Sequence, residues 1–194
     1  MPALHLTGDE QADRLLSTDP FALLIGMLLD QQIAMEVAFL GPARLAERLD
    51  GELTPATVAG TDPDVLEELF RTKPAIHRYP GSMAKRVQAL ATHLVEHHDG
   101  DAARVWEDAA DGRDLKRRLT ALPGYGDQKA RIFIALLAKQ CDVRPVGWEE
   151  AAGEYAEPGY RSIADVLDED SLQRVRESKQ AAKAAAKGGK AAAG

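Results

Sequence analysis

The sequence has little cysteine, few aromatic residues and no excess of positive charge. Cys141 is the single cysteine in 194 residues, so the chain can form no intrachain disulfide. One thiol cannot hold a structural zinc ion or an iron–sulfur cluster, and we expect no metal and no other cofactor. The net charge of −7 excludes a surface coated all round with basic side chains, which is one way to bind nucleic acid.

Long apolar runs and alternating strand patterns are also missing. No apolar stretch approaches the length of a transmembrane helix, and the N-terminus lacks a basic segment followed by an apolar one. We therefore expect a cytoplasmic protein without a membrane partner. Most apolar residues recur at helical spacing, which predicts an all-α protein.

Basic residues gather near the C-terminus. From Arg174 onward there are six of them against Glu177 alone, which gives this segment +5 and leaves −12 for the rest of the chain. We expect one domain over residues 1–172 and a Lys/Ala-rich basic tail over 173–194. Residues 183–194 have no apolar face to bury and should be disordered. The tail would attract phosphates without sequence preference, or only keep the chain soluble.

The most specific pattern is a very short turn between two amphipathic helices, predicted over 111–122 and 126–140 (the hairpin, 111–140). The turn reads Leu-Pro-Gly-Tyr-Gly over 122–126. Pro123 cannot continue a helix, and the two glycines allow positive φ and close approach of another backbone. Asp127 suits the first turn of the second helix, where an acidic side chain meets the positive end of the dipole.

Such a turn exposes backbone N–H groups at a helix N-terminus, which is a binding site for an anion such as a nucleic-acid phosphate. We expect double-stranded DNA as the partner, contacted by Gly124, Tyr125, Gly126 and Lys129. The alternative is an ordinary helical hairpin with a glycine-rich turn.

Near the N-terminus, Thr18-Asp19-Pro20 predicts the start of a helix. Residues 21–40 are apolar on nearly every side, which predicts one buried helix that Gly41-Pro42 ends. Gln31 and Gln32 interrupt the apolar pattern midway. A polar pair there must be hydrogen-bonded or reach a cleft.

The N-terminal apolar segment with its two glutamines and the helical hairpin together resemble the helix-hairpin-helix (HhH-GPD) DNA glycosylases, which include endonuclease-III-like and alkyl-adenine enzymes. Leu28–Ala34 and Leu122–Ala130 have the order and relative spacing of that superfamily, and the resemblance covers about residues 18–150. It implies a two-lobed helical fold, with the hairpin in one lobe, the chain ends in the other and a cleft between them. Such enzymes bend duplex DNA and extrude one nucleotide.

The resemblance also implies roles for individual side chains. In relatives a Gln lies near the space that the extruded base leaves in the stack, and here it corresponds to Gln32, or else to Gln31. The alternative is that these amides only tie helices together. The loop with His77, Arg78 and Tyr79 has the composition of a nucleic-acid-facing loop or of a surface turn. Arg78 is its candidate DNA contact.

Two departures from the family concern catalysis. Relatives that also cleave the strand carry a Lys early in the second hairpin helix, where this chain has Gln128. Lys129 lies about 100° further round the helix, where it contacts a phosphate or faces solvent. Schiff-base chemistry needs an amine at the sugar carbon, so we expect no lyase activity.

The second departure is the family's essential Asp, which Gly147 replaces, or Val146 if the spacing differs by one. The nearest carboxylates are Glu150, Glu149 and Asp142. We take Glu150 and then Glu149 as candidate catalytic residues, although both could simply begin a solvated acidic helix. Trp148 beside them either stacks on a base or fills the core.

Three functions fit these observations. The first is a monofunctional DNA glycosylase that hydrolyses the N-glycosidic bond of a damaged or mismatched base with a displaced carboxylate. The second is a non-catalytic DNA-binding relative that recognises damage after losing the Asp. The third is a helical protein-interaction domain. In the first two cases we expect association with the nucleoid.

Overall fold

The computed structural model describes residues 4–191, which contain helices and loops but no β-strand. The chain is therefore all-α, as predicted. The helices are α1 (Glu10–Thr18), α2 (Pro20–Leu29), α3 (Met35–Arg48), α4 (Pro55–Gly60), α5 (Pro63–Arg71), α6 (Pro80–His98), α7 (Arg104–Glu107), α8 (Gly112–Ala121), α9 (Asp127–Gln140), α10 (Trp148–Ala152) and α11 (Glu169–Ala191), with the short 3-10 helices η1 (Gly153–Tyr155) and η2 (Ile163–Asp165).

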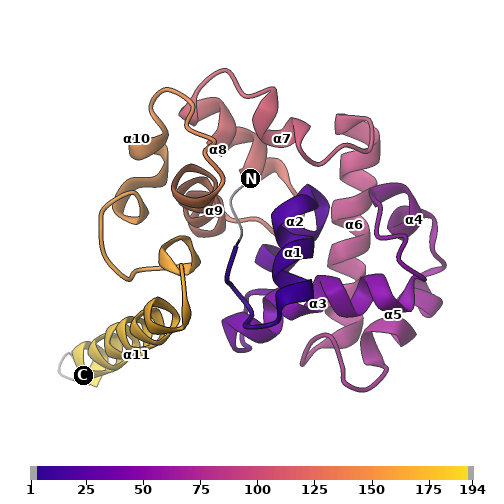
Figure 1. Ribbon diagram of the computed structural model, residues 1–194, viewed down its shortest axis with the longest axis horizontal. Helices are drawn as coiled ribbons and strands as arrows, with labels where there is room; N and C mark the ends of the chain where they lie inside the picture. Colours follow the sequence, from indigo (N-terminus) through magenta and orange to yellow (C-terminus); the bar gives the residue numbers. More distant parts are fainter. Residues whose placement is uncertain (1–3, 192–194) are drawn as a thin grey trace.

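The helices form two lobes around α2. Helices α3 to α6 lie on one side of it, and the hairpin of α8 and α9 lies on the other together with α10 (Figure 1). Helix α6 packs against α4 and α5, while α10 and η2 pack against α9. The fold is two-lobed as expected, but the hairpin shares its lobe with the C-terminal elements instead of facing them across a cleft.

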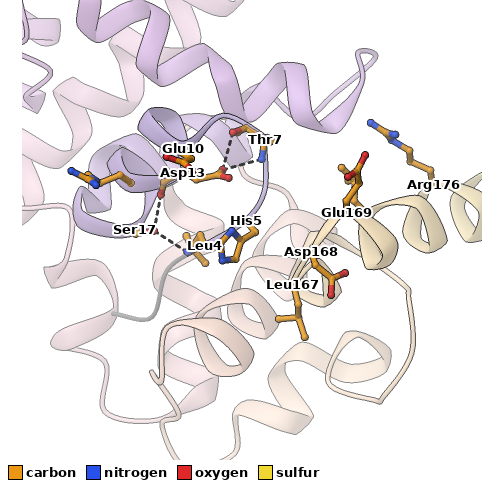
Figure 2. A pocket seen from close by; sticks show the side chains of 13 residues that line it. Leu4, His5, Thr7, Glu10, Asp13, Ser17, Leu167, Asp168, Glu169 and Arg176 are labelled. Carbon is orange, nitrogen blue, oxygen red and sulfur yellow. Dashed lines mark hydrogen bonds between the residues drawn. The ribbon is translucent and has the colours of Figure 1, made fainter.

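The N-terminal segment and the start of α11 come together beside α1. The N-terminal segment, α1 and the start of α11 border a hollow of about 840 Å³ (Figure 2). Its buried acidic group, Asp13, accepts hydrogen bonds from the N–H groups of Leu6 (3.0 Å) and Thr7 (2.9 Å) and from the Thr7 hydroxyl (2.8 Å). These bonds fix the N-terminal segment on α1, so this polar group of the hollow is already satisfied by the chain.

Helix α11 differs from the tail that we expected. Its first half packs on the domain, where Val175 is buried and Arg176 forms an ion pair with Glu36 of α3. The helix then continues to Ala191, so residues 183–191 are helical where disorder was predicted. Alanine and lysine both favour the helical state, which explains the difference. Residues 192–194 lie outside the described part of the chain.

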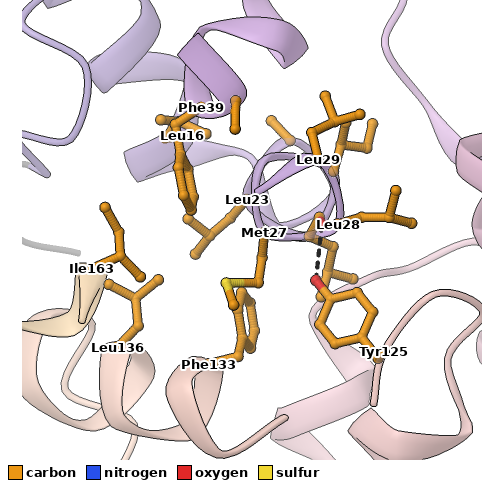
Figure 3. Close-up of a cluster of buried hydrophobic side chains, with 14 of the residues drawn as sticks. Leu16, Leu23, Met27, Leu28, Leu29, Phe39, Tyr125, Phe133, Leu136 and Ile163 are labelled. Carbon is orange, nitrogen blue, oxygen red and sulfur yellow. Dashed lines mark hydrogen bonds between the residues drawn. The ribbon is translucent and has the colours of Figure 1, made fainter. Parts of the chain in front are cut away.

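Helix α2 is the centre of the hydrophobic core. It begins at Pro20, where the sequence predicts a helix start, but Asp19 and not Thr18 caps it, by accepting hydrogen bonds from two first-turn N–H groups; every residue from Phe21 to Leu29 is buried. Figure 3 shows its side chains packed between Phe39 of α3 on one side and Phe133 and Tyr125 of the hairpin on the other. A helix that is apolar on all sides needs neighbours all round, and this one has them.

The prediction of one helix over residues 21–40 is wrong. Helix α2 ends at Leu29, a loop follows, and α3 begins at Met35 and runs through Gly41 and Pro42. Gly41 allows α3 to approach α2 closely, because a Cβ at this position would lie 2.5 Å from the Leu29 side chain. The Gly-Pro pair therefore does not end a helix here.

Candidate functional site

Residues 30–34, which we call the Gln loop, join α2 to α3. Gln32 has a φ of 59°, in the left-handed region, and its side chain is exposed. A residue with a side chain is uncommon in this conformation and stays there only when its surroundings hold it. The Gln loop therefore presents an amide side chain at the surface, and its shape must be fixed by neighbouring groups.

Lys129 of α9 fixes one side of the Gln loop. Its ammonium donates hydrogen bonds to the carbonyl oxygens of Met27 (2.5 Å), Leu28 (2.7 Å) and Asp30 (3.2 Å). Burial lowers the pKa of Lys129 to about 8, although the nearby Asp30 carboxylate acts to raise it. The side chain thus neither faces solvent nor reaches toward a phosphate, in contrast to both positions expected from the sequence.

His77 holds the Gln loop from the other lobe. Its Nδ1 accepts a hydrogen bond from the Tyr79 N–H (3.0 Å), so its Nε2 carries the proton and donates to the Gln31 carbonyl (3.0 Å). Burial lowers the pKa of His77, which keeps the imidazole neutral. The expectation of an exposed His77 is wrong, since the ring is 2% exposed and acts as a brace.

The side chain of Gln31 is also engaged. Its Nε2 donates to the Leu28 carbonyl (2.9 Å), and its Oε1 accepts from the guanidinium of Arg86 (3.2 Å). Gln31 therefore ties α2 to α6. Gln32 has no hydrogen bond of this kind among the described residues, so the two neighbouring amides differ in their environment.

The hairpin turn has the geometry that its sequence predicts. Gly124 has a φ of +85°, and α9 begins at Asp127 with Gly126 as its N-cap. No side chain caps this end of α9, so the N–H groups of its first turn have no side-chain acceptor. Asp127 forms an ion pair with Lys116 of α8 at 2.7 Å, which lowers the pKa of the Asp127 carboxyl.

Tyr125 points inward from the turn. Its ring is 5% exposed and its hydroxyl donates a hydrogen bond of 2.7 Å to the Leu24 carbonyl of α2 (Figure 3). Its backbone N–H donates to the Leu122 carbonyl (3.0 Å). Among the turn residues proposed to meet DNA, Tyr125 therefore serves to anchor the turn on the core.

Gln128, in the first turn of α9, lies beside η1. Its Nε2 donates a hydrogen bond of 3.0 Å to the Tyr155 hydroxyl. An amide has no nucleophilic lone pair comparable to that of an amine, so this side chain cannot form a Schiff base.

The candidate carboxylates lie on α10. Glu149 and Glu150 are exposed on α10, which packs against α8 and α9. Glu150 borders an open hollow of about 470 Å³ together with Lys116, Val146 and Gly147. Gly147 is the N-cap of α10, and Val146 beside it is 85% exposed.

Two exposed side chains stand next to His77. The guanidinium of Arg78 lies 5.4 Å from the ring centre of Tyr79, and this ring is 42% exposed. Trp148, by contrast, is half-buried against the core. The Arg78–Tyr79 pair offers a cation and a flat ring at the surface close to the Gln loop, which suits stacking with a base.

The structure brings together Gln31, Gln32 and Lys129, with Arg78 near them through His77, whereas Glu149 and Glu150 lie on α10 against α8 and α9. It also adds residues that sequence reasoning missed as parts of this site. Asp30 has a side chain only 16% exposed and lies 3.9 Å from the Nζ of Lys179 in α11. The run of three polar residues at 30–32 within an apolar stretch was the one signal that could have revealed it.

Within residues 4–191, no three His, Cys, Asp or Glu side chains are grouped so as to hold a metal ion. No helix in the same part of the chain combines the length and the apolar character needed to cross a membrane.

Comparison with known proteins identifies one family. The model of the HhH-GPD superfamily of base excision DNA repair proteins matches residues 25–189. Curated proteins and solved structures give no match. The matched segment runs from α2 through the Gln loop and the hairpin into α11, and it covers most of the sequence. The chain therefore belongs to the HhH-GPD superfamily of base excision DNA repair proteins.

Proposed function

We propose that the protein binds duplex DNA with the α8–α9 hairpin on a phosphate and with Gln32 directed into the base stack, so that one base is unstacked. The observation that carries this proposal is the conformation of Gln32, which is left-handed, exposed and held by braces from both lobes. Holding a residue in a sparsely populated conformation has an energetic cost, which points to a function for the side chain.

Other contacts support this arrangement. The first-turn N–H groups of α9 are free of side-chain caps and so can meet a phosphate oxygen. Gln31 is engaged with Leu28 and Arg86, which leaves Gln32 as the better candidate for entering the stack. Arg78 and Tyr79 lie at the surface near the same loop, where an unstacked base could rest on the ring.

The expected reaction is hydrolysis of an N-glycosidic bond without strand cleavage. Water would supply the hydroxyl to the sugar C1′ and the proton to the departing base, while a carboxylate stabilises the positive charge on the sugar. We propose Glu150, or else Glu149, for this role. Gln128 supplies no amine for a lyase step.

A non-catalytic DNA-binding protein is the second candidate function. The exposure of Glu149 and Glu150 and the glycine at position 147 favour it, because a charge-stabilising carboxylate works best where water is excluded. In that case the protein would mark or distort damaged DNA for other enzymes.

DNA distortion can be tested with duplexes that contain 2-aminopurine, whose fluorescence rises when the base leaves the stack. We expect the wild type to raise this fluorescence and Gln32→Ala to lose most of the rise while it keeps most of its affinity. Gln11→Ala, an exposed Gln on α1, is the matched control. An unchanged fluorescence rise with Gln32→Ala would contradict the proposal.

Hydrolysis of the N-glycosidic bond can be tested with duplexes that each carry one damaged or mismatched base. After incubation with the protein, alkali cuts the strand at any abasic site. Strand breaks with the wild type but not with Glu149→Gln/Glu150→Gln would support the proposed carboxylates. Loss of cleavage in Asp30→Asn alone would assign the chemistry to the Gln loop. Binding of every duplex without cleavage would favour the non-catalytic function.

A further inference from the structure

We propose that Lys129 is a positioning residue that holds α2 and α3 apart at the Gln loop and so sets the position of Gln32. The inference rests on the proposed function, in which Gln32 enters the base stack. It concerns a side chain that, although next to the DNA-binding turn, is directed into the protein.

The acceptors that Lys129 occupies are the ones a continuous helix would need. In an α-helix the N–H of residue i bonds to the carbonyl of residue i−4. Continuation beyond Leu29 would pair Met27 with Gln31, Leu28 with Gln32 and Asp30 with Ala34. The ammonium of Lys129 binds the carbonyls of Met27, Leu28 and Asp30 instead.

A cation is well suited to this position. The last carbonyls of a helix lack partners within the helix and carry its negative dipole end, so a positive group there is stabilised. Without the ammonium, the carbonyls of Met27 and Asp30 would lose this partner and the Leu28 carbonyl would keep only the Gln31 amide, and the apolar pattern of residues 21–40 would favour the continuous helix. In that helix Gln32 would lose its left-handed conformation and with it its outward position.

Lys129 also joins the two parts that are proposed to meet DNA. Its own backbone N–H belongs to the uncapped first turn of α9, while its side chain ends at the Gln loop. Binding of a phosphate at the turn and presentation of Gln32 therefore share one residue. A shift in the position of the hairpin would therefore also move the Gln loop.

The chain offers a matched control for this contact. Tyr125 also ties the hairpin to α2, through a hydrogen bond from its hydroxyl to the Leu24 carbonyl, one turn before the helix ends. Tyr125→Phe removes a buried tie between the same two elements but leaves the three carbonyls bound by Lys129 untouched. The two substitutions thus separate loss of stability from loss of loop position.

The experiment compares the wild type, Lys129→Met, Tyr125→Phe and Gln32→Ala in the full chain. Duplex affinity is measured by fluorescence anisotropy, and unstacking by 2-aminopurine fluorescence at saturating protein. We expect Lys129→Met, which keeps the backbone N–H of the α9 first turn, to reduce the unstacking signal at saturating protein by a factor of about five to ten. Tyr125→Phe should keep that signal even if it melts at a lower temperature.

Three further experiments separate a change in loop position from a loss of folding. Lys129→Gln keeps a polar head on a shorter side chain, is less costly to bury than a charge and should show the same loss if Lys129→Met does not fold. Amide hydrogen exchange should slow selectively in residues 31–34 of the Lys129 variants, because their N–H groups become hydrogen-bonded when α2 continues as one helix. In a Gln32→Ala background, Lys129→Met should lower the signal no further.

The possible results are distinct. An unstacking signal in Lys129→Met equal to that of Tyr125→Phe would overturn the role of Lys129 and leave the proposed function intact. A signal that Gln32→Ala does not alter would overturn the proposed function itself, and the positioning role with it.

Discussion

Gly112 and Gly147 meet so closely that a Cβ on Gly112 would lie 2.4 Å from the carbonyl oxygen of Gly147. The Gly112 N–H also donates a hydrogen bond of 2.8 Å to the Val146 carbonyl. The first turn of α8 is therefore fastened to the loop before α10. This loop contains Val146 and Gly147, and its course depends on the absence of a side chain at position 112.

We predict that Gly112→Ala destabilises the protein. The methyl group would collide with backbone atoms that cannot rotate away, and overpacking of this kind costs about 1–3 kcal/mol. Denaturation in urea measures the change. Gly60→Ala is the control, because a Cβ at Gly60 in α4 meets nothing within 4 Å. Equal stability of the two variants would show that the loop yields more readily than its contacts indicate.

The turn glycines should respond differently to substitution. A Cβ on Gly126 meets nothing within 4 Å, and its φ is −94°, so Gly126→Ala should fold with unchanged stability. If a DNA backbone lies against this position, the methyl group should lower duplex affinity about tenfold, or about 1.4 kcal/mol. Fluorescence anisotropy measures this. Unchanged affinity would remove the hairpin turn from the DNA interface.

Gly124 supplies the contrast. Its φ of +85° and its contact with Leu28, 3.1 Å from a Cβ, predict that Gly124→Ala loses about 1–2 kcal/mol of stability. A loss of affinity in this variant could reflect folding, so Gly126→Ala is the decisive member of the pair.

Lys129 should make stability depend on alkaline pH. Its pKa is about 8 in the folded protein against 10.5 as the ordinary value. Between these pH values the unfolded chain holds a proton that the folded chain has released, so the free energy of unfolding rises with pH. The gain, by up to about 3 kcal/mol, should be missing from Lys129→Met. Urea denaturation of both proteins from pH 7.5 to 10 measures the difference.

His77 should make the stability of the protein depend on acidic pH. Burial lowers its pKa below the ordinary value of 6.5, so the unfolded chain takes up a proton first as the pH falls. Stability from this residue is complete above pH 6.5 and is lost below it. Protonation would also place an N–H group at Nδ1 against the Tyr79 N–H. NMR titration of the imidazole should show a neutral ring with the proton on Nε2 at pH 7.

Local signals predicted much of the fold. Asp19 and Pro20 start α2, and the pattern around Pro123 and Gly124 gives both hairpin helices nearly to their ends. These features depend on neighbours in sequence, through caps, dihedral preferences and helical spacing. The all-α class follows from the same spacing.

The Gln loop could not be predicted in this way. The residues that hold it, Lys129 and His77, lie 99 and 46 residues away from the carbonyls of Asp30 and Gln31 that they bind. Asp30, Gln31 and Gln32 nevertheless carried a hint. Successive residues of a helix point about 100° apart, so three polar side chains in a row cannot all avoid a core that surrounds the helix.

Gly41 and Gly112 show a second limit of prediction from the sequence, which concerns the role of a glycine. Each glycine could mark a turn or a close approach between elements, and sequence alone favoured a helix end at Gly41. In the folded chain it lies within α3 against Leu29. Which role applies depends on the neighbour across the interface, and one sequence does not name it.

The bond between Lys129 and the end of α2 has a consequence for how DNA would be searched. In the proposed function, the α8–α9 turn binds a phosphate and Gln32 enters the base stack. Because Lys129 joins these two parts through the protein interior, they move as one rigid body, and the protein cannot test a base pair by moving the Gln loop alone. The duplex must yield instead. Dwell times along DNA should then follow the local softness of the double helix, and be longest at mismatches and at pyrimidine–purine steps.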